Sequence, residues 1–107
     1  MNFPRRMHRG CNFLGSRGTA NTIRCEAEDA LRARPDTVVV FDFFGVHGIS
    51  HSFTDELVAP LSDLLGSTFS RRAVFENCTP EVQEAVELVC EMHGLYRPSF
   101  GTNRAAA

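Results

Sequence analysis

The hydrophobic pattern predicts one central buried strand. From Val38 to Phe44 every residue is apolar except Asp42, and this is the pattern of a strand covered on both faces. Gly45 and Gly48 follow where that strand must end, and glycine gives the backbone the freedom that a sharp turn needs. We therefore expect this strand at the centre of a parallel sheet, with a glycine-containing loop at its carboxyl end.

Apolar residues at helical spacing predict one helix before this strand in the sequence and one helix after it. The first has Thr19 or Asn21 as its N-cap and closes before Pro35. The second has Ser52 as its N-cap, because the spacing from Ser52 to Asp55 is that of a capping box. It closes at residues 66–68, and Pro60 should kink it.

A further strand and a third helix complete the pattern. Residues 71–77 form the strand candidate, and Thr79 followed by Pro80 and Glu81 is the arrangement of an N-cap, an N1 proline and a first-turn acid. Gly94 fits the position just after the end of the helix. Residues 95–107 show no readable element.

Strands and helices therefore alternate, and the fold class is α/β. Residues 11–14 add a first short strand, which gives a mostly parallel sheet with three main helices in β-α-β-α-β-α order. We expect a basic N-terminal arm over residues 1–12 that is flexible, one small domain over residues 13–94, and a C-terminal tail over residues 95–107.

Charge and composition narrow the function classes. All eleven basic residues are arginine, so no lysine can form a Schiff base or a P-loop. The four cysteines lack C-x-x-C or zinc-finger spacing, and no apolar segment resembles a signal peptide or a membrane span. A cytoplasmic protein with reduced thiols is expected. Four arginines lie in or just after the N-terminal arm: Arg5, Arg6, Arg9 and Arg17. They leave nucleic-acid binding as one alternative.

Two motifs carry a resemblance to a known family. The run FDFFGVHGISHSFTDELVAPL, followed by FENCTPEVQEAVEL, resembles the STAS-like domain family, which is similar to bacterial anti-sigma-factor antagonists. The resemblance covers residues 13–93 and implies a non-catalytic regulatory module that binds a protein partner. In the antagonists, a serine at the loop that enters the second helix is phosphorylated by a histidine-kinase-like ATPase, and this breaks the complex.

The antagonists' acceptor position falls on His51 in this chain, between Ser50 and Ser52. Ser52 is the candidate phospho-acceptor, because a phosphate there would lie at the positive end of a helix dipole. Its alternative role is a simple helix cap. The predicted partner-binding surface comprises Gly45, His47, Gly48, Ser50, His51, Ser52, Phe53 and Asp55. No cofactor is expected, and the alternative is a small enzyme or nucleotide-binding protein that uses the same loop.

Several other polar residues could have a functional role or an ordinary structural one. Asp42 either shapes the loop or faces a ligand at the edge of the sheet. His47, His51 and Asp55 are four residues apart but do not share one helix, so no metal site is expected. Cys78 precedes a helix N-terminus, where a thiolate would be favoured, but a core cysteine is the simpler interpretation. Cys90 and His93 are likewise expected as helix-face neighbours in or near the core.

Overall fold

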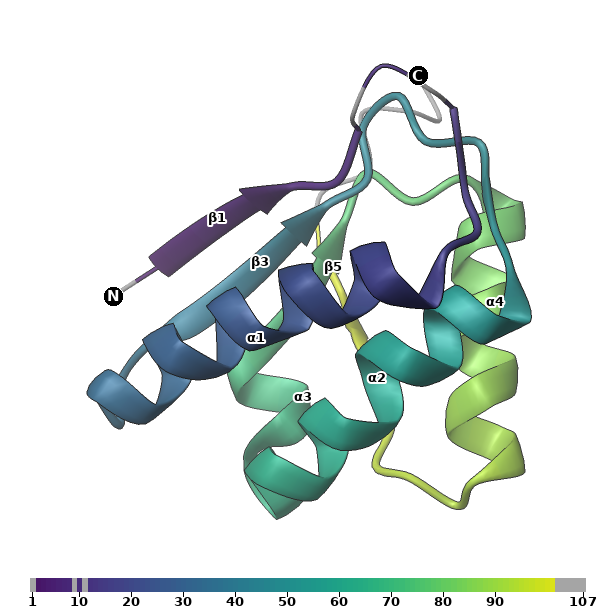
Figure 1. The fold of residues 1–107 in the computed structure, drawn as a ribbon. Coiled ribbons are helices and arrows are strands. Elements are labelled where there is room, and N and C mark those ends of the chain that lie inside the picture. Colours follow the sequence, from purple (N-terminus) through teal and green to yellow (C-terminus); the bar gives the residue numbers. More distant parts are fainter. Residues whose placement is uncertain (1, 9, 11, 102–107) are drawn as a thin grey trace.

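The structure, a computed structural model, describes residues 2–8, 10 and 12–101. It is a small α/β domain (Figure 1). The strands are β1 (Asn2–Arg6), β2 (Phe13–Leu14), β3 (Val38–Asp42), β4 (Gly48–Ile49), β5 (Ala73–Glu76) and β6 (Ser99–Phe100). The helices are α1 (Arg17–Ala33), α2 (His51–Leu65), the 3-10 turn η1 (Gly66–Thr68), α3 (Phe69–Arg72) and α4 (Pro80–Met92).

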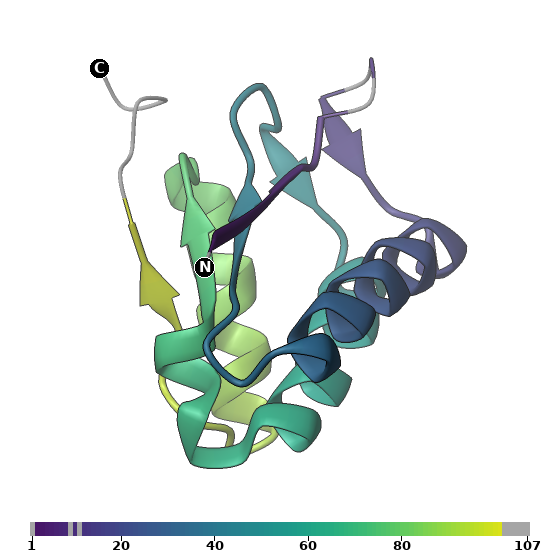
Figure 2. The same ribbon diagram turned by 90° about the vertical axis from the view of Figure 1, so that its left-hand side faces the viewer.

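The main sheet contains four parallel strands in the order β1-β3-β5-β6. A second, two-stranded parallel sheet joins β2 to β4. Each new strand of the main sheet lies beside the previous one, and a helical connection separates them. The helices α1, α2 and α4 consequently line up along one face of the sheet (Figures 1 and 2).

This one-sided packing corrects the prediction of a strand covered on both faces. In β3, Val39 and Phe41 are fully buried, whereas Val38, Val40 and Asp42 on the opposite face are partly exposed. The strand is central in the sheet, since β1 and β5 pair with it on either side. The apolar outer residues reflect the preference of β-branched valine for strands and do not indicate a second covering layer.

The core lies between the sheet and the helix row and is rich in phenylalanine. Phe41, Phe43, Phe53, Phe69 and Phe75 are all fully buried. The rings of Phe41 and Phe75, from neighbouring strands, stack with their centroids 5.4 Å apart. Such cross-strand aromatic pairs hold β3 and β5 in register.

The N-terminal segment is a strand and not the flexible arm expected from the sequence. Residues 2–6 form β1 and pair with residues 38–42 of β3. Met7 is fully buried, and its N–H donates to the Asp42 carbonyl at 2.8 Å. This strand was missed because residues 2–6 lack apolar periodicity. An edge strand can be held by backbone hydrogen bonds, which need no such pattern. Pro4 is compatible with that position, since proline is tolerated at a sheet edge.

Several boundaries also differ from the expected ones. Ser16, not Thr19 or Asn21, caps α1, and residues 71–72 belong to α3, so β5 is shorter than the predicted strand 71–77. By contrast, Pro60 lies inside α2, as expected, and that helix ends at Leu65, directly before the predicted closing residues 66–68. The expected strand over residues 11–14 is observed at residues 13–14, and Cys11 lies outside the described residues.

The C-terminal part contains one element that the sequence did not reveal. Residues 99–100 form β6 beside β5, although residues 95–107 were expected to lack secondary structure. The preceding end of α4 is as predicted: Gly94 has φ of 63°. The N–H groups of Gly94 and Leu95 donate to the carbonyls of Glu91 and Cys90, at 3.3 and 2.8 Å, which is a Schellman motif. In the part of the chain that the structure describes, no helix combines the length and hydropathy needed to span a membrane.

Candidate partner-binding surface

Three helix N-termini meet at the carboxyl edge of the sheet and are tied together by their cap hydroxyls. The caps are Ser16, Ser50 and Thr79, whose hydroxyl oxygens accept hydrogen bonds from backbone N–H groups of α1, α2 and α4. The Ser50 hydroxyl also donates to the Gly15 carbonyl at 3.0 Å, and the Thr79 hydroxyl donates to the His47 carbonyl at 3.1 Å. The hydroxyls of Ser50 and Thr79 thus each cap a helix and also hold an earlier segment of the chain against it.

Ser50, and not Ser52, is the N-cap of α2. Its hydroxyl accepts from the Phe53 N–H at 3.0 Å, so the helix begins at His51. The reason is the neighbouring strand pair: β4 ends at Ile49, and the Ser50 N–H donates to the Leu14 carbonyl at 2.9 Å. The chain leaves the sheet at Ser50 and places Ser52 in the first turn of the helix.

Asp42 shapes the loop that follows β3. Its carboxylate accepts a hydrogen bond from the Phe44 N–H at 2.9 Å and another from the Asn77 side-chain amide at 2.7 Å. Asn77 itself has φ of 57°, a left-handed conformation that asparagine tolerates better than most residues. The carboxylate therefore links the ends of β3 and β5.

Gly45 allows the loop to turn closely over the N-terminal segment. Its φ is 89°, a region that favours glycine. A Cβ atom at this position would lie 3.0 Å from the Cδ2 of His8. Any larger residue would therefore meet both backbone strain and the imidazole ring, so the loop conformation depends on this glycine.

Two exposed aromatic side chains flank the loop, and neither belongs to the site predicted from the sequence. Phe13 and Phe44 are 55% and 51% exposed. Phe13 lies opposite Gly48 in the β2/β4 pair, and a Cβ at Gly48 would lie 3.2 Å from the Phe13 ring. The signals were present in the sequence: each phenylalanine is next to, or one residue from, a predicted turn. Exposed aromatic side chains are enriched at binding surfaces.

The predicted site residues divide into accessible and inaccessible ones. His47 and His51 are exposed, and Gly45, Gly48, Ser50, Ser52 and Asp55 are partly buried. Phe53 is fully buried, which corrects its assignment to the contact surface. It follows the helical spacing that directs its ring into the core, where it anchors the start of α2.

Asp55 is engaged within the protein. Its carboxylate lies 2.6 Å from the Nε2 of His93, which caps the end of α4. The same carboxylate is 3.7 Å from the Arg17 guanidinium. It therefore joins α1, α2 and α4 and does not converge with His47 and His51. Among the described residues, no group of three or more His, Cys, Asp or Glu side chains could hold a metal ion.

Cys78 and Cys90 are buried thiols. Burial, with a smaller contribution from the charge of Asp42, raises the pKa of Cys78 to about 12. Burial, with a smaller contribution from Glu87, raises the pKa of Cys90 to about 11. The helix N-terminus beside Cys78 does not produce a reactive thiolate, because burial outweighs the helix dipole.

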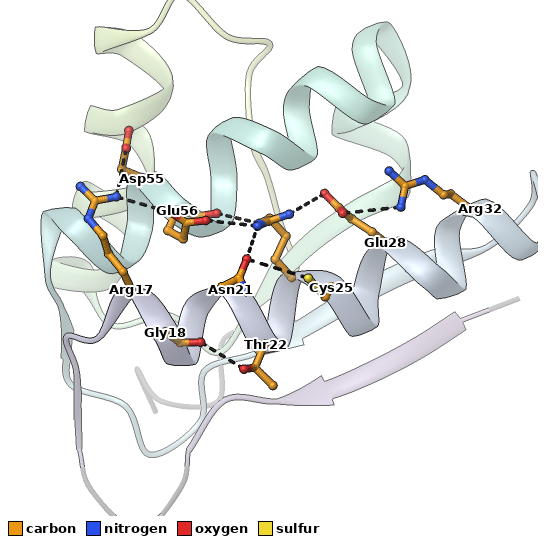
Figure 3. Close-up of polar contacts among 10 residues, drawn as sticks. Arg17, Gly18, Asn21, Thr22, Cys25, Glu28, Arg32, Asp55 and Glu56 are labelled. Atoms are coloured by element: carbon orange, nitrogen blue, oxygen red, sulfur yellow. Dashed lines mark hydrogen bonds and ion pairs between the residues drawn. The ribbon is translucent and has the colours of Figure 1, made fainter.

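Two arginines of the first 24 residues form close ion pairs with acidic residues of the same chain. Arg5 lies 3.1 Å from Glu26, and Arg24 lies 3.1 Å from both Glu28 and Glu56. Burial alone would lower the pKa of Arg24, but the hydrogen bonds and charges of its two partners outweigh that effect and raise it. Figure 3 shows the acidic side chains of Glu28 and Glu56 between α1 and α2. This network holds the two helices together.

Surface hollows are found along α4. One has a volume of about 450 Å³, and a neighbouring one of about 360 Å³ shares Glu87 with it. Neither is lined by residues of the loop over 43–50. Comparison with protein-family models, curated proteins and solved structures found no match to this chain.

Proposed function

We propose that this chain is a small regulatory module that binds a protein partner through its carboxyl-edge surface. That surface consists of residues 43–52 together with Phe13. The observation that carries the proposal is the pair of exposed aromatic side chains: Phe44 on a loop held by defined hydrogen bonds, and Phe13 on the strand beside it. Rigid loops lose little conformational entropy on binding, and exposed aromatic rings supply contact area. The STAS-like resemblance of the same segment gives a partner class, a histidine-kinase-like ATPase.

Ser52 is the residue through which phosphorylation would control this surface. Ser50 already uses its hydroxyl as a cap and as a donor to Gly15, so its modification would disrupt the fold locally. Ser52 is partly exposed in the first turn of α2. A phosphate there would lie near the positive helix terminus and be tolerated by the fold. It would add about two negative charges next to His51 on the proposed surface.

The experiment compares Ser52→Asp with Ser52→Ala after the partner has been captured by pull-down. The free energy of unfolding of both variants should lie within about 1 kcal/mol of the wild-type value, because neither substitution removes the cap. Ser52→Asp should weaken the complex at least about tenfold in calorimetry, whereas Ser52→Ala should bind nearly as wild type. Identical binding by the two variants would rule out control through Ser52.

The surface itself is tested with Phe44→Ser, whose matched control is Tyr96→Ser. Each variant removes an aromatic ring that is about half exposed, but only Phe44 lies on the proposed surface. Partner binding should fall at least about tenfold for Phe44→Ser and change less than about twofold for Tyr96→Ser. Equal effects of the two substitutions would contradict the assignment of the surface.

The alternatives predict different ligands. A nucleotide-binding protein or enzyme at the same loop would show heat on titration with ATP or GTP, which a protein-binding module would not. A nucleic-acid binder would associate with steep salt dependence. Deletion of residues 1–10 is unsuitable as a test, since it removes β1. Arg6→Ala, which removes an exposed arginine at the end of β1, is the appropriate variant.

A further inference from the structure

The outer face of α4 exposes large apolar side chains far from the carboxyl-edge surface. Leu88 and Met92 are 52% and 61% exposed and lie one helical turn apart. Covering these leucine and methionine side chains with another surface would remove apolar area from water, which is favourable. α4 is the last helix of the row, with α2 on one side (Figure 1).

The same face is acidic. Glu81, Glu84 and Glu91 are exposed and, at helical spacing, fall on the same side as Leu88. No basic residue occurs between Pro80 and Met92. Two adjoining hollows lie beside this face. Their linings include Glu84, Glu87, Glu91 and Arg97, but neither Leu88 nor Met92. A ligand along α4 would therefore meet an apolar pair bordered by carboxylates.

We propose that this α4 face is a second docking surface, for a basic amphipathic helix of a partner protein. An apolar pair four residues apart matches the anchors of a helix that packs along another helix. Lysine or arginine beside those anchors would meet the three exposed glutamates, and α4, with 13 residues, is about 20 Å long. The occupant is accordingly a helix of about four turns.

A second copy of this chain fits the face less well. The arginines that α1 could present are already paired: Arg24 with Glu28 and Glu56, and Arg32 with Glu28 at 3.7 Å. Docking a copy through α1 would break these pairs to form new ones. A partner with unpaired basic residues has no such cost.

The test uses the full chain and a labelled 14-residue probe peptide with leucine at helical spacing and lysine elsewhere. Fluorescence anisotropy should show saturable binding that weakens as salt is raised. A second peptide, with glutamate in place of each lysine, should bind at least about tenfold more weakly. Equal binding of the two peptides would overturn the proposal, because the acidic face would then not select its ligand.

Paired variants locate the site. Leu88→Gln with Met92→Gln should reduce binding of the lysine peptide at least about tenfold, and Glu84→Gln with Glu91→Gln should do the same and reduce the salt dependence. The matched control, Asp29→Asn with Asp63→Asn, removes the same number of exposed carboxylates from other helices and should leave binding within about twofold. An equal loss in the control would overturn the proposal, because the peptide would then respond only to the net charge of the protein.

Sedimentation of the wild-type protein tests whether a second copy of the chain occupies this face instead. A monomer over the concentration range of the peptide titration supports an external partner. Self-association that disappears in Leu88→Gln with Met92→Gln would show that a second copy occupies this face and would overturn the proposal. All the substituted side chains are exposed, so circular dichroism of each variant should match the wild type.

Discussion

Ser50 and Ser52 are two residues apart, yet their hydroxyls have different surroundings. The Ser50 hydroxyl accepts from the first turn of α2 and donates to Gly15, so one atom fixes both the helix start and the preceding segment. Ser52 lies inside that first turn. The capping-box spacing from Ser52 to Asp55 therefore mimicked a helix start without forming one. Local spacing could not show that β4 ends only at Ile49.

This difference predicts unequal losses of stability for the same serine-to-alanine substitution at the two positions. Ser50→Ala should lower the free energy of unfolding by about 1–2 kcal/mol, because it removes an N-cap. Ser52→Ala should change it by less than about 0.5 kcal/mol, as expected for a side chain outside such a feature. Urea titrations of the two variants measure both values. A larger loss for Ser52→Ala than for Ser50→Ala would contradict the cap assignment.

At the scale of elements, the sequence predicted what depends on local chemistry and missed what depends on pairing. The start of α4 at Thr79 and its end at Gly94 agree with prediction, since both follow from caps within a few residues. Strands β1 and β6 were missed, because both lie at sheet edges and are held by backbone hydrogen bonds to neighbours distant in sequence.

The two faces of β3 were also misread, and this gives a prediction for that strand. Phe41 is fully buried under the helices, whereas Val40 on the outer face is partly exposed. Phe41→Ala should cost about 3–5 kcal/mol of unfolding free energy. Val40→Ala should cost about 1 kcal/mol or less, because little apolar area is newly exposed. Comparable losses in a chemical melt would mean that both faces are covered.

At the scale of the whole molecule, the location of the candidate surface could be predicted but its composition could not. The sequence placed a loop and a helix start at the carboxyl edge of a parallel sheet, where such folds bind ligands. Phe13 reaches that edge only through the pairing of β2 with β4. His8 reaches it because the segment after β1 passes beneath Gly45. Both contacts join segments more than 30 residues apart, which no local pattern reports.

The buried thiols make the stability of the whole fold sensitive to alkaline pH. Cys78 and Cys90 have their pKa raised from 9.0 to about 12 and about 11 in the folded protein. Between pH 9 and these values, the unfolded chain loses the thiol protons while the folded chain keeps them. The unfolded state then binds fewer protons, so the unfolding free energy must fall as pH rises. Below pH 9 both states are protonated and these thiols contribute no pH dependence.

Urea titrations at pH 8 and pH 10.5 measure this loss. The wild type should be clearly less stable at pH 10.5, and Cys78→Ala with Cys90→Ala should show a smaller difference between the two pH values, although its stability at pH 8 will be lower for lack of the buried sulfur atoms. Cys25→Ala is the matched control, because Cys25 is exposed and its removal should leave the pH dependence as in the wild type. If the double variant loses as much stability as the wild type between pH 8 and pH 10.5, the alkaline transition belongs to other groups and these two thiols do not control it.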